Sequence, residues 1–290
     1  MRRHRTTAVF LVLAGLVAAV STTSASGRQS GAVPRLVFPL VAKTDLWDNY
    51  GDPRPNGRHA GIDMENPWRA PVVAVEDGSV KYWDSGLGGC MLYLYGRSGT
   101  TYMYIHLNND LTARNDNKGG CAKGISFAVP DGARVTAGQQ IAWNGDSGDA
   151  NGNPHLHFEV HPNDGGDVNP YRHLKRAVKP LFAAPAGAVF SLALRGKLVA
   201  AGAGAATLDI NRVRQYPGGR WLDIDEREVE LTVPLGTDPG LFDEFTGNTR
   251  RPLKKPAGVT AYTLKANATP GAIVGAPGAL LLGRVTTASK

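Results

Sequence analysis

The chain has 290 residues, of which 42% are hydrophobic and 20% charged, with 36 glycines and 19 prolines. This composition is typical of a β protein with many turns and argues against a mainly helical or disordered chain. The formal net charge is +7, but the basic residues form no stripe interleaved with aromatic side chains, so nucleic acid is not a predicted partner.

Residues 1–26 have the parts of a secretory signal peptide. Three arginines near the start precede an apolar run, Ala8–Val20, and small residues follow it. A membrane span needs about 20 apolar residues, so we expect cleavage near Ala25 or Ser26 and no stable membrane insertion afterwards; an uncleaved anchor is the alternative. Loss of the three arginines lowers the charge from +7 to about +4, which favours an anionic surface. The protein is therefore predicted to be secreted, as an extracellular or wall-associated protein.

Residues 27–178 are predicted to form an all-β domain. From Val37 to Leu174 short apolar runs are separated by Gly, Pro, Asn and Asp, and no stretch keeps a helical period. The predicted strands include Pro71–Val75, Ser79–Trp83, Met91–Tyr95, Thr101–Leu107, Gln140–Trp143 and His155–Val160.

The chain has two cysteines, Cys90 and Cys121. In an exported chain, two cysteines allow one intramolecular pairing, and we predict a disulfide between them. It would tether the Asn- and Gly-rich segment Asn108–Gly124 to the strand that begins near Cys90. Two free buried thiols are the alternative.

Residues 179–290 are predicted to form a second, smaller β-rich domain, a barrel or a sandwich. The Pro-, Ala- and Gly-rich segment Lys179–Gly187 is typical of a linker. Beyond it, apolar or alternating runs separated by turns predict strands at Val189–Val199, Ala206–Val213, Glu228–Val233, Thr260–Lys265 and Leu280–Thr286. The segment after the linker has no histidine or cysteine, so we predict an accessory domain without chemistry of its own.

Four of the seven histidines fall in three short motifs within the first domain. His59 and Asp63 lie four residues apart, a spacing that brings both side chains to one face in a strand or in a helical turn. His155 and His157 lie two apart in an alternating segment, so a strand presents both on one face. Each motif alone is more often structural than catalytic.

A third histidine, His106, ends the predicted strand Thr101–Leu107. Alternation along that strand predicts that Tyr102, Tyr104 and His106 share one face. Two histidines and one carboxylate with a position left open form the ligand set that catalytic zinc prefers. The occurrence of all three motifs in one β-rich domain therefore indicates a zinc hydrolase site.

With these motifs the chain resembles the lysostaphin/LytM-type zinc peptidoglycan endopeptidases, whose pattern is HxxxD, a strand histidine and then HxH. The resemblance runs from about Phe38 to Leu174 and includes Tyr50–Arg54, Val135–Gln139 and Val168–Pro170. It implies an antiparallel, mainly β fold, one Zn²⁺ per chain and bacterial peptidoglycan as the partner, cleaved in a stem peptide or a cross-link.

The resemblance also implies roles for individual residues. His59, Asp63 and His157 would bind zinc, while His106 and His155 would remain free of the metal. We expect His155 to act as general base and His106 to donate a hydrogen bond to the developing oxyanion.

Tyr104 and Asn153 are predicted to contact the substrate. A noncatalytic member of the family that binds wall or activates another hydrolase is the alternative, as is a general secreted protease. The oligomeric state is not predicted.

Overall fold

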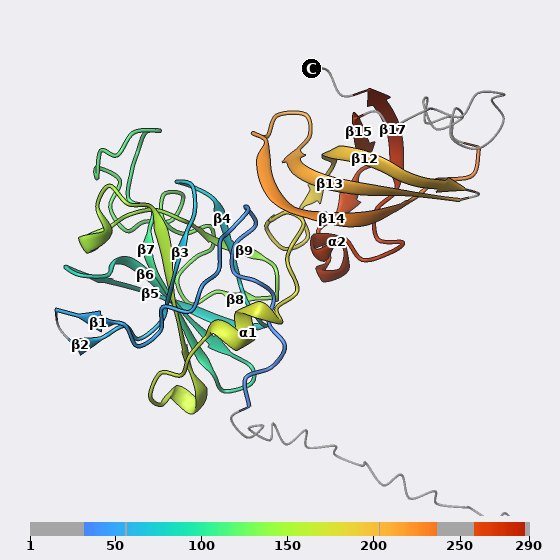
Figure 1. The fold of residues 1–290 in the computed structure, drawn as a ribbon. Coiled ribbons are helices and arrows are strands. Elements are labelled where there is room, and N and C mark those ends of the chain that lie inside the picture. Colours follow the sequence, from blue (N-terminus) through green and yellow to red (C-terminus); the bar gives the residue numbers. More distant parts are fainter. Residues whose placement is uncertain (1–31, 56, 203, 237–257, 288–290) are drawn as a thin grey trace, which may run out of the picture.

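The computed structural model describes residues 32–55, 57–202, 204–236 and 258–287 (Figure 1). Within them the chain forms two units, each with antiparallel sheet around its own hydrophobic core. The all-β prediction is therefore confirmed. The predicted signal peptide, residues 1–26, lies outside the described residues, and no helix among the described ones is long and apolar enough to cross a membrane.

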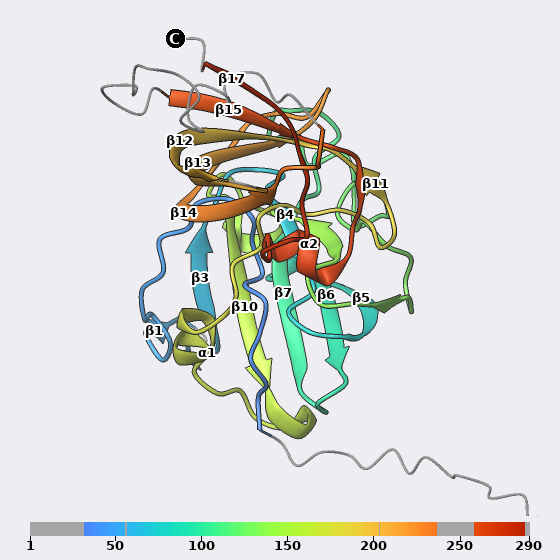
Figure 2. The ribbon, with the colours of Figure 1, turned by 90° about the vertical axis from the view of Figure 1, so that its right-hand side faces the viewer.

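The N-terminal unit is built on a six-stranded antiparallel sheet. The strand order is β3-β10-β7-β6-β5-β8, and Figure 2 shows the central strands side by side. A hairpin pairs β1 with β2, and a separate small sheet pairs β4 with β9. The bounds are β1 Pro53–Arg54, β2 Gly57–Arg58, β3 Ile62–Glu65, β4 Pro71–Val73, β5 Gly78–Ser85, β6 Gly89–Gly96, β7 Thr101–Leu107, β8 Arg134–Val135, β9 Gln140–Trp143 and β10 His155–His161, with the short helices η1 Gly148–Ala150, η2 Pro162–Asp164 and α1 Tyr171–Lys175.

The alternation of β10 explains how the main sheet presents two different faces. Leu156, Phe158 and Val160 are fully buried in the core, because every second residue of a strand points to the same side. The residues between them face the other side, where His155 and His157 lie at the surface of the sheet. The core thus fixes the strand that carries two of the predicted site residues.

The C-terminal unit contains one five-stranded antiparallel sheet in the order β14-β13-β12-β15-β17. Its edge strands approach each other at one end, where Thr232 N donates a hydrogen bond to Leu280 O at 3.0 Å. The sheet therefore curls partway toward a barrel around a core that includes Leu194 and Ile210. The bounds are β11 Val189–Phe190, β12 Leu192–Gly202, β13 Ala205–Gln215, β14 Leu222–Thr232, β15 Gly258–Thr263, β16 Ala266–Asn267 and β17 Leu282–Thr287, with helix α2 Pro270–Val274.

The two units are joined by a packed segment, which corrects the predicted linker Lys179–Gly187. Leu181 and Phe182 are buried in the C-terminal core, and Ala184 O accepts a hydrogen bond from Gln140 N of the other unit at 3.1 Å. The segment is rich in Pro, Ala and Gly, but it also contains these two large apolar side chains. Their burial favours a fixed connection between the two units.

Further hydrogen bonds fix the position of the C-terminal unit. Lys43 N donates to Asp223 O at 2.7 Å, and the Arg220 guanidinium donates to Trp68 O at 2.9 Å. These contacts bring the start of β14 against the N-terminal unit, close to the end of the main sheet that carries the predicted site.

Candidate metal centre

The adjacent strands β3 and β10 bring the first and last sequence motifs together. Asp63 on β3 lies directly opposite His157 on β10 in the antiparallel register, and His59 lies in the turn that leads into β3. Gly61 makes this approach possible, because a Cβ at that position would lie 2.5 Å from Phe158 O. A side chain between His59 and Asp63 would therefore push the turn away from β10.

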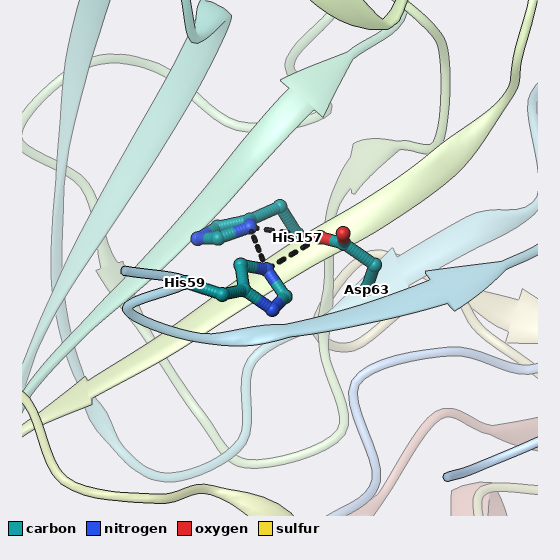
Figure 3. A group of neighbouring side chains, drawn as sticks. All are labelled: His59, Asp63 and His157. Carbon is teal, nitrogen blue, oxygen red and sulfur yellow. Dashed lines mark hydrogen bonds and ion pairs between the residues drawn. The ribbon is translucent and has the colours of Figure 1, made fainter. Parts of the chain in front are cut away.

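His59, Asp63 and His157 converge on one point (Figure 3). His59 Nε2 lies 3.0 Å from Asp63 Oδ1 and 3.0 Å from His157 Nδ1, while His157 Nδ1 lies 2.8 Å from Asp63 Oδ1. His59 is buried, and the other two are partly buried. Among the described residues these three form a group that could hold a metal ion.

Each ligand histidine makes a hydrogen bond with the ring nitrogen that points away from Asp63. These hydrogen bonds indicate that the three converging atoms would bind a cation. His59 Nδ1 lies 2.6 Å from Asn49 O, and His157 Nε2 lies 2.9 Å from a carboxylate oxygen of Glu159. Both partners are acceptors, so each neutral ring carries its hydrogen on the outer nitrogen. Two nitrogen lone pairs and one carboxylate oxygen then face one another within about 3 Å, and a bound cation relieves their repulsion.

A proton competes with a metal for the same place. Burial disfavours the charged form of His157, but hydrogen bonds to Asp63 and Glu159 outweigh it and raise the pKa of His157 to about 9. Burial also opposes ionisation of Asp63, yet the hydrogen bonds from His157 and His59 hold its pKa well below the usual range. Metal binding must therefore release a proton.

Two partners of the ligands were not among the predicted site residues. Glu159 accepts hydrogen bonds from His157 and, at 2.7 Å, from His161 Nε2. Arg54, in the β1–β2 hairpin, donates to Asp63 Oδ2 at 2.6 Å, which leaves Oδ1 to face the histidines. Alternation along β10 placed Glu159 on the histidine face, but no spacing rule identifies Arg54.

His155 and His106 lie beside the three converging atoms. His155 Nε2 is 3.7 Å from Asp63 Oδ1, and the rings of His155 and His106 lie 4.8 Å apart. His155 Nδ1 donates to Asn153 O at 2.8 Å and His106 Nδ1 to Ser147 O at 2.9 Å. The structure thus brings together all five histidine and aspartate positions that the sequence singled out.

The surroundings of His106 bear on its expected role as a hydrogen-bond donor. Burial, then the neighbouring His155, lowers the pKa of His106 to about 4, so the ring is neutral near pH 7. Its single hydrogen is used on Nδ1 toward Ser147 O, and Nε2 presents a lone pair to the groove. In this tautomer neutral His106 accepts a proton or a hydrogen bond there, so donation to an oxyanion requires the protonated ring or the other tautomer.

The prediction that Tyr104 contacts the substrate is wrong. Tyr104 lies opposite Phe158 in the register, is fully buried in the core, and accepts a hydrogen bond from Val75 N at 3.0 Å. His106 nevertheless reaches the groove, because its φ of 62° breaks the alternation of β7. The sequence shows no glycine or proline at this position that would reveal the change.

A groove of about 910 Å³ opens in front of the histidines. Met91, Tyr93 and Leu87 line one part, and Asn153 lines another. Asn153 is exposed, and its contact with the substrate stays a prediction. The volume of the groove lies within the range of ligand-binding clefts in proteins.

The predicted disulfide is present and supports one wall of the site. Cys90 and Cys121 are bonded, and their Cα atoms lie 5.0 Å apart. Cys90 N also donates to Ser147 Oγ at 2.8 Å, and Ser147 O is the acceptor for His106. The loop tethered by Cys121 and the turn that orients His106 therefore meet at the start of β6.

Comparison with known proteins gives matches among metallopeptidases, and no family model matches the chain. An uncharacterized metalloprotease of Haemophilus influenzae is 34% identical over 114 residues, which are 39% of this chain and 20% of that protein. The chain thus spans about a fifth of that relative's length.

Two solved structures of similar chains are described as peptidases. The catalytic domain of the antimicrobial peptidase lysostaphin from Staphylococcus simulans is 26% identical, with 46% of this chain and 92% of that one covered at a TM-score of 0.37. A zinc-containing peptidase from Vibrio cholerae is 27% identical, with 47% and 39% covered at a TM-score of 0.36. The resemblance to lysostaphin/LytM-type peptidases that the motifs predict is supported by the sequence match to a metalloprotease.

Proposed function

We infer that this chain belongs to the lysostaphin/LytM-type peptidases, and we propose that it is a secreted zinc metalloendopeptidase that hydrolyses peptide bonds in bacterial peptidoglycan. The observation that carries this proposal is the set of three converging acceptor atoms beside two further imidazoles. The sequence match to a metalloprotease supports the reaction class. The predicted signal peptide, together with the resemblance of the motifs, supports the location and the substrate.

The donor set favours zinc among the common metals. His59 Nε2, His157 Nδ1 and Asp63 Oδ1 would hold the ion, and two imidazoles with one carboxylate are a catalytic zinc set. When bound, zinc lowers the pKa of its water to about 7 and polarises the scissile carbonyl. Glu159 and Asn49 keep the two ligand rings in the tautomers that leave their inner nitrogens free.

His155 is the general base in this proposal. Its Nδ1 hydrogen is engaged by Asn153 O, so Nε2 is free to take the proton of an attacking water and return it to the leaving amine. His106 Nε2 is a second acceptor on the same side of the groove and can orient the water. The core-facing side chains of β10 hold His155 in position, because they lock the strand on which it sits.

The test is the chemistry of the products. The zinc-loaded protein and a His155→Gln variant with equal zinc content are incubated with purified cell walls, and the released fragments are identified by mass spectrometry. New peptide termini from the parent protein, reduced by about 10²–10⁴-fold in the variant, are expected. Intact walls with both proteins, despite one zinc per chain, would reject an endopeptidase and favour a binding role.

A further inference from the structure

Three arginines surround one indole ring on the C-terminal unit. The guanidinium carbons of Arg195 and Arg214 each lie 4.8 Å from the centre of the Trp221 ring, and that of Arg212 lies 5.8 Å away. A fourth guanidinium, on Arg284, lies 4.7 Å from the ring of Tyr262. We refer to the surface formed by Arg195, Arg212, Arg214, Arg284, Trp221 and Tyr262 as the arginine face.

Strand register places these side chains on the outer side of the five-stranded sheet. Arg195 on β12 pairs with Arg212 on β13, and Tyr262 on β15 pairs with Arg284 on β17. Between these two rows lies a row that includes Leu194, which is buried in the core. Because neighbouring rows point to opposite sides of a sheet, the arginine rows face away from the core.

The positive charges of the arginine face are poorly neutralised within the chain. Among the described residues, Asp223 is its single ion-pair partner, with Arg212 at 2.8 Å. The side chains of Arg195 and Arg214 make no hydrogen bond to the described residues, and their Nε atoms are buried without a partner. Like charges gathered around one ring repel each other, and an anion between them would offset that repulsion.

Acidic side chains are available on the same strands but are not used. Asp209 and Glu228 face each other across β13 and β14, yet neither forms an ion pair with an arginine among the described residues. Packing of alkyl stems against the indole explains why long side chains are present. It does not explain why three guanidinium groups share one ring while these carboxylates stay apart.

We propose that the arginine face binds an anionic cell-wall polymer in which phosphodiesters link short polyol units. The guanidinium group offers a planar fork of donors that matches phosphate oxygens. Charges spread around an apolar ring suit a chain whose phosphates are separated by short uncharged segments. Nucleic acid fits less well, because bases need an open aromatic face for stacking, and guanidinium groups already contact the indole.

The location connects this surface to the metal centre. Trp221 and Asp223 line a cleft of about 670 Å³ between the two units, together with Asn153. Asn153 also lines the groove in front of the histidines. A polymer on the arginine face would therefore hold the wall next to the groove, whether or not the metal centre cleaves peptidoglycan.

The test measures binding of poly(glycerol phosphate) to the full chain at several salt concentrations. In the double variant Arg195→Gln/Arg214→Gln, we expect affinity to fall about tenfold and the dependence of log K on log salt to become shallower by about two. The matched control, Arg114→Gln/Arg134→Gln, removes the same charge from exposed positions of the N-terminal unit and is expected to change affinity less than about twofold.

Equal losses in both double variants would overturn the proposal, because binding would then depend on net charge alone. Arg284→Gln covers the case in which the double variant fails to fold, since this arginine is exposed; we expect a loss of about two- to fourfold, and unchanged affinity would count against the site. Tighter binding of single-stranded DNA with the same number of phosphates would also overturn the assignment of the partner.

Discussion

Strands β10 and β7 both carry histidines into the groove, but they do so in different ways. His155 and His157 reach it by ordinary alternation along β10. His106 reaches it because a φ of 62° interrupts the alternation of β7, while Tyr104, two residues earlier, points into the core. The comparison shows that a strand pattern predicts the direction of a side chain as long as every residue keeps an extended backbone.

The largest effect is expected from the ligand that β3 places opposite β10. Asp63→Asn keeps the shape but removes the negative charge that the two ligand histidines share. We expect zinc content below about a tenth of the parent's and activity reduced more than about 10³-fold. Metal analysis after dialysis and a product assay measure both. Asp131→Asn, which breaks the exposed pair with Lys81, is the control, and equal zinc in both variants would contradict the ligand assignment.

A smaller loss is expected at the residue that orients the β10 ligand. Glu159→Gln keeps an acceptor for His157 Nε2 but removes its charge, so zinc affinity should fall about 10–100-fold. His161→Gln changes the outer end of the same chain of hydrogen bonds and should weaken zinc binding less. Competition with a chelator measures both affinities. If Glu159→Gln bound zinc as tightly as the parent, the strand alone would position His157, and the charge of Glu159 would not be needed.

The sequence could predict those parts of the site that depend on local patterns. The strands were predictable because alternation and turn residues are local, and the ligand motifs because their spacing matches zinc chemistry. Arg54 was not, since its contact with Asp63 depends on how a hairpin folds back. The packed segment with Leu181 and Phe182 was missed because composition alone does not reveal which apolar side chains find a core.

Tyr104→Phe tests whether Tyr104 on β7 stabilises the core. Tyr104 Oη accepts the Val75 N–H in a fully buried position, so its removal leaves that donor without a partner. We expect the free energy of unfolding to fall by about 1–3 kcal/mol with kcat unchanged. Denaturant unfolding and a product assay on the same sample measure the two quantities. A large loss of kcat without a loss of stability would indicate that Tyr104 contacts the substrate.

The backbone of His106 gives the smallest and most specific test. Ala and Gly substitutions both remove the imidazole, but Gly adopts a positive φ readily, whereas Ala is strained there by about 1–2 kcal/mol. Part of that difference is offset by the greater freedom of Gly in the unfolded chain, so His106→Gly should be more stable than His106→Ala by about 0.5–1 kcal/mol. Paired denaturation curves measure the difference. The same pair at His155, on extended backbone, should show the opposite order. A more stable Ala variant at both positions would mean that β7 does not depend on a left-handed residue to present its histidine.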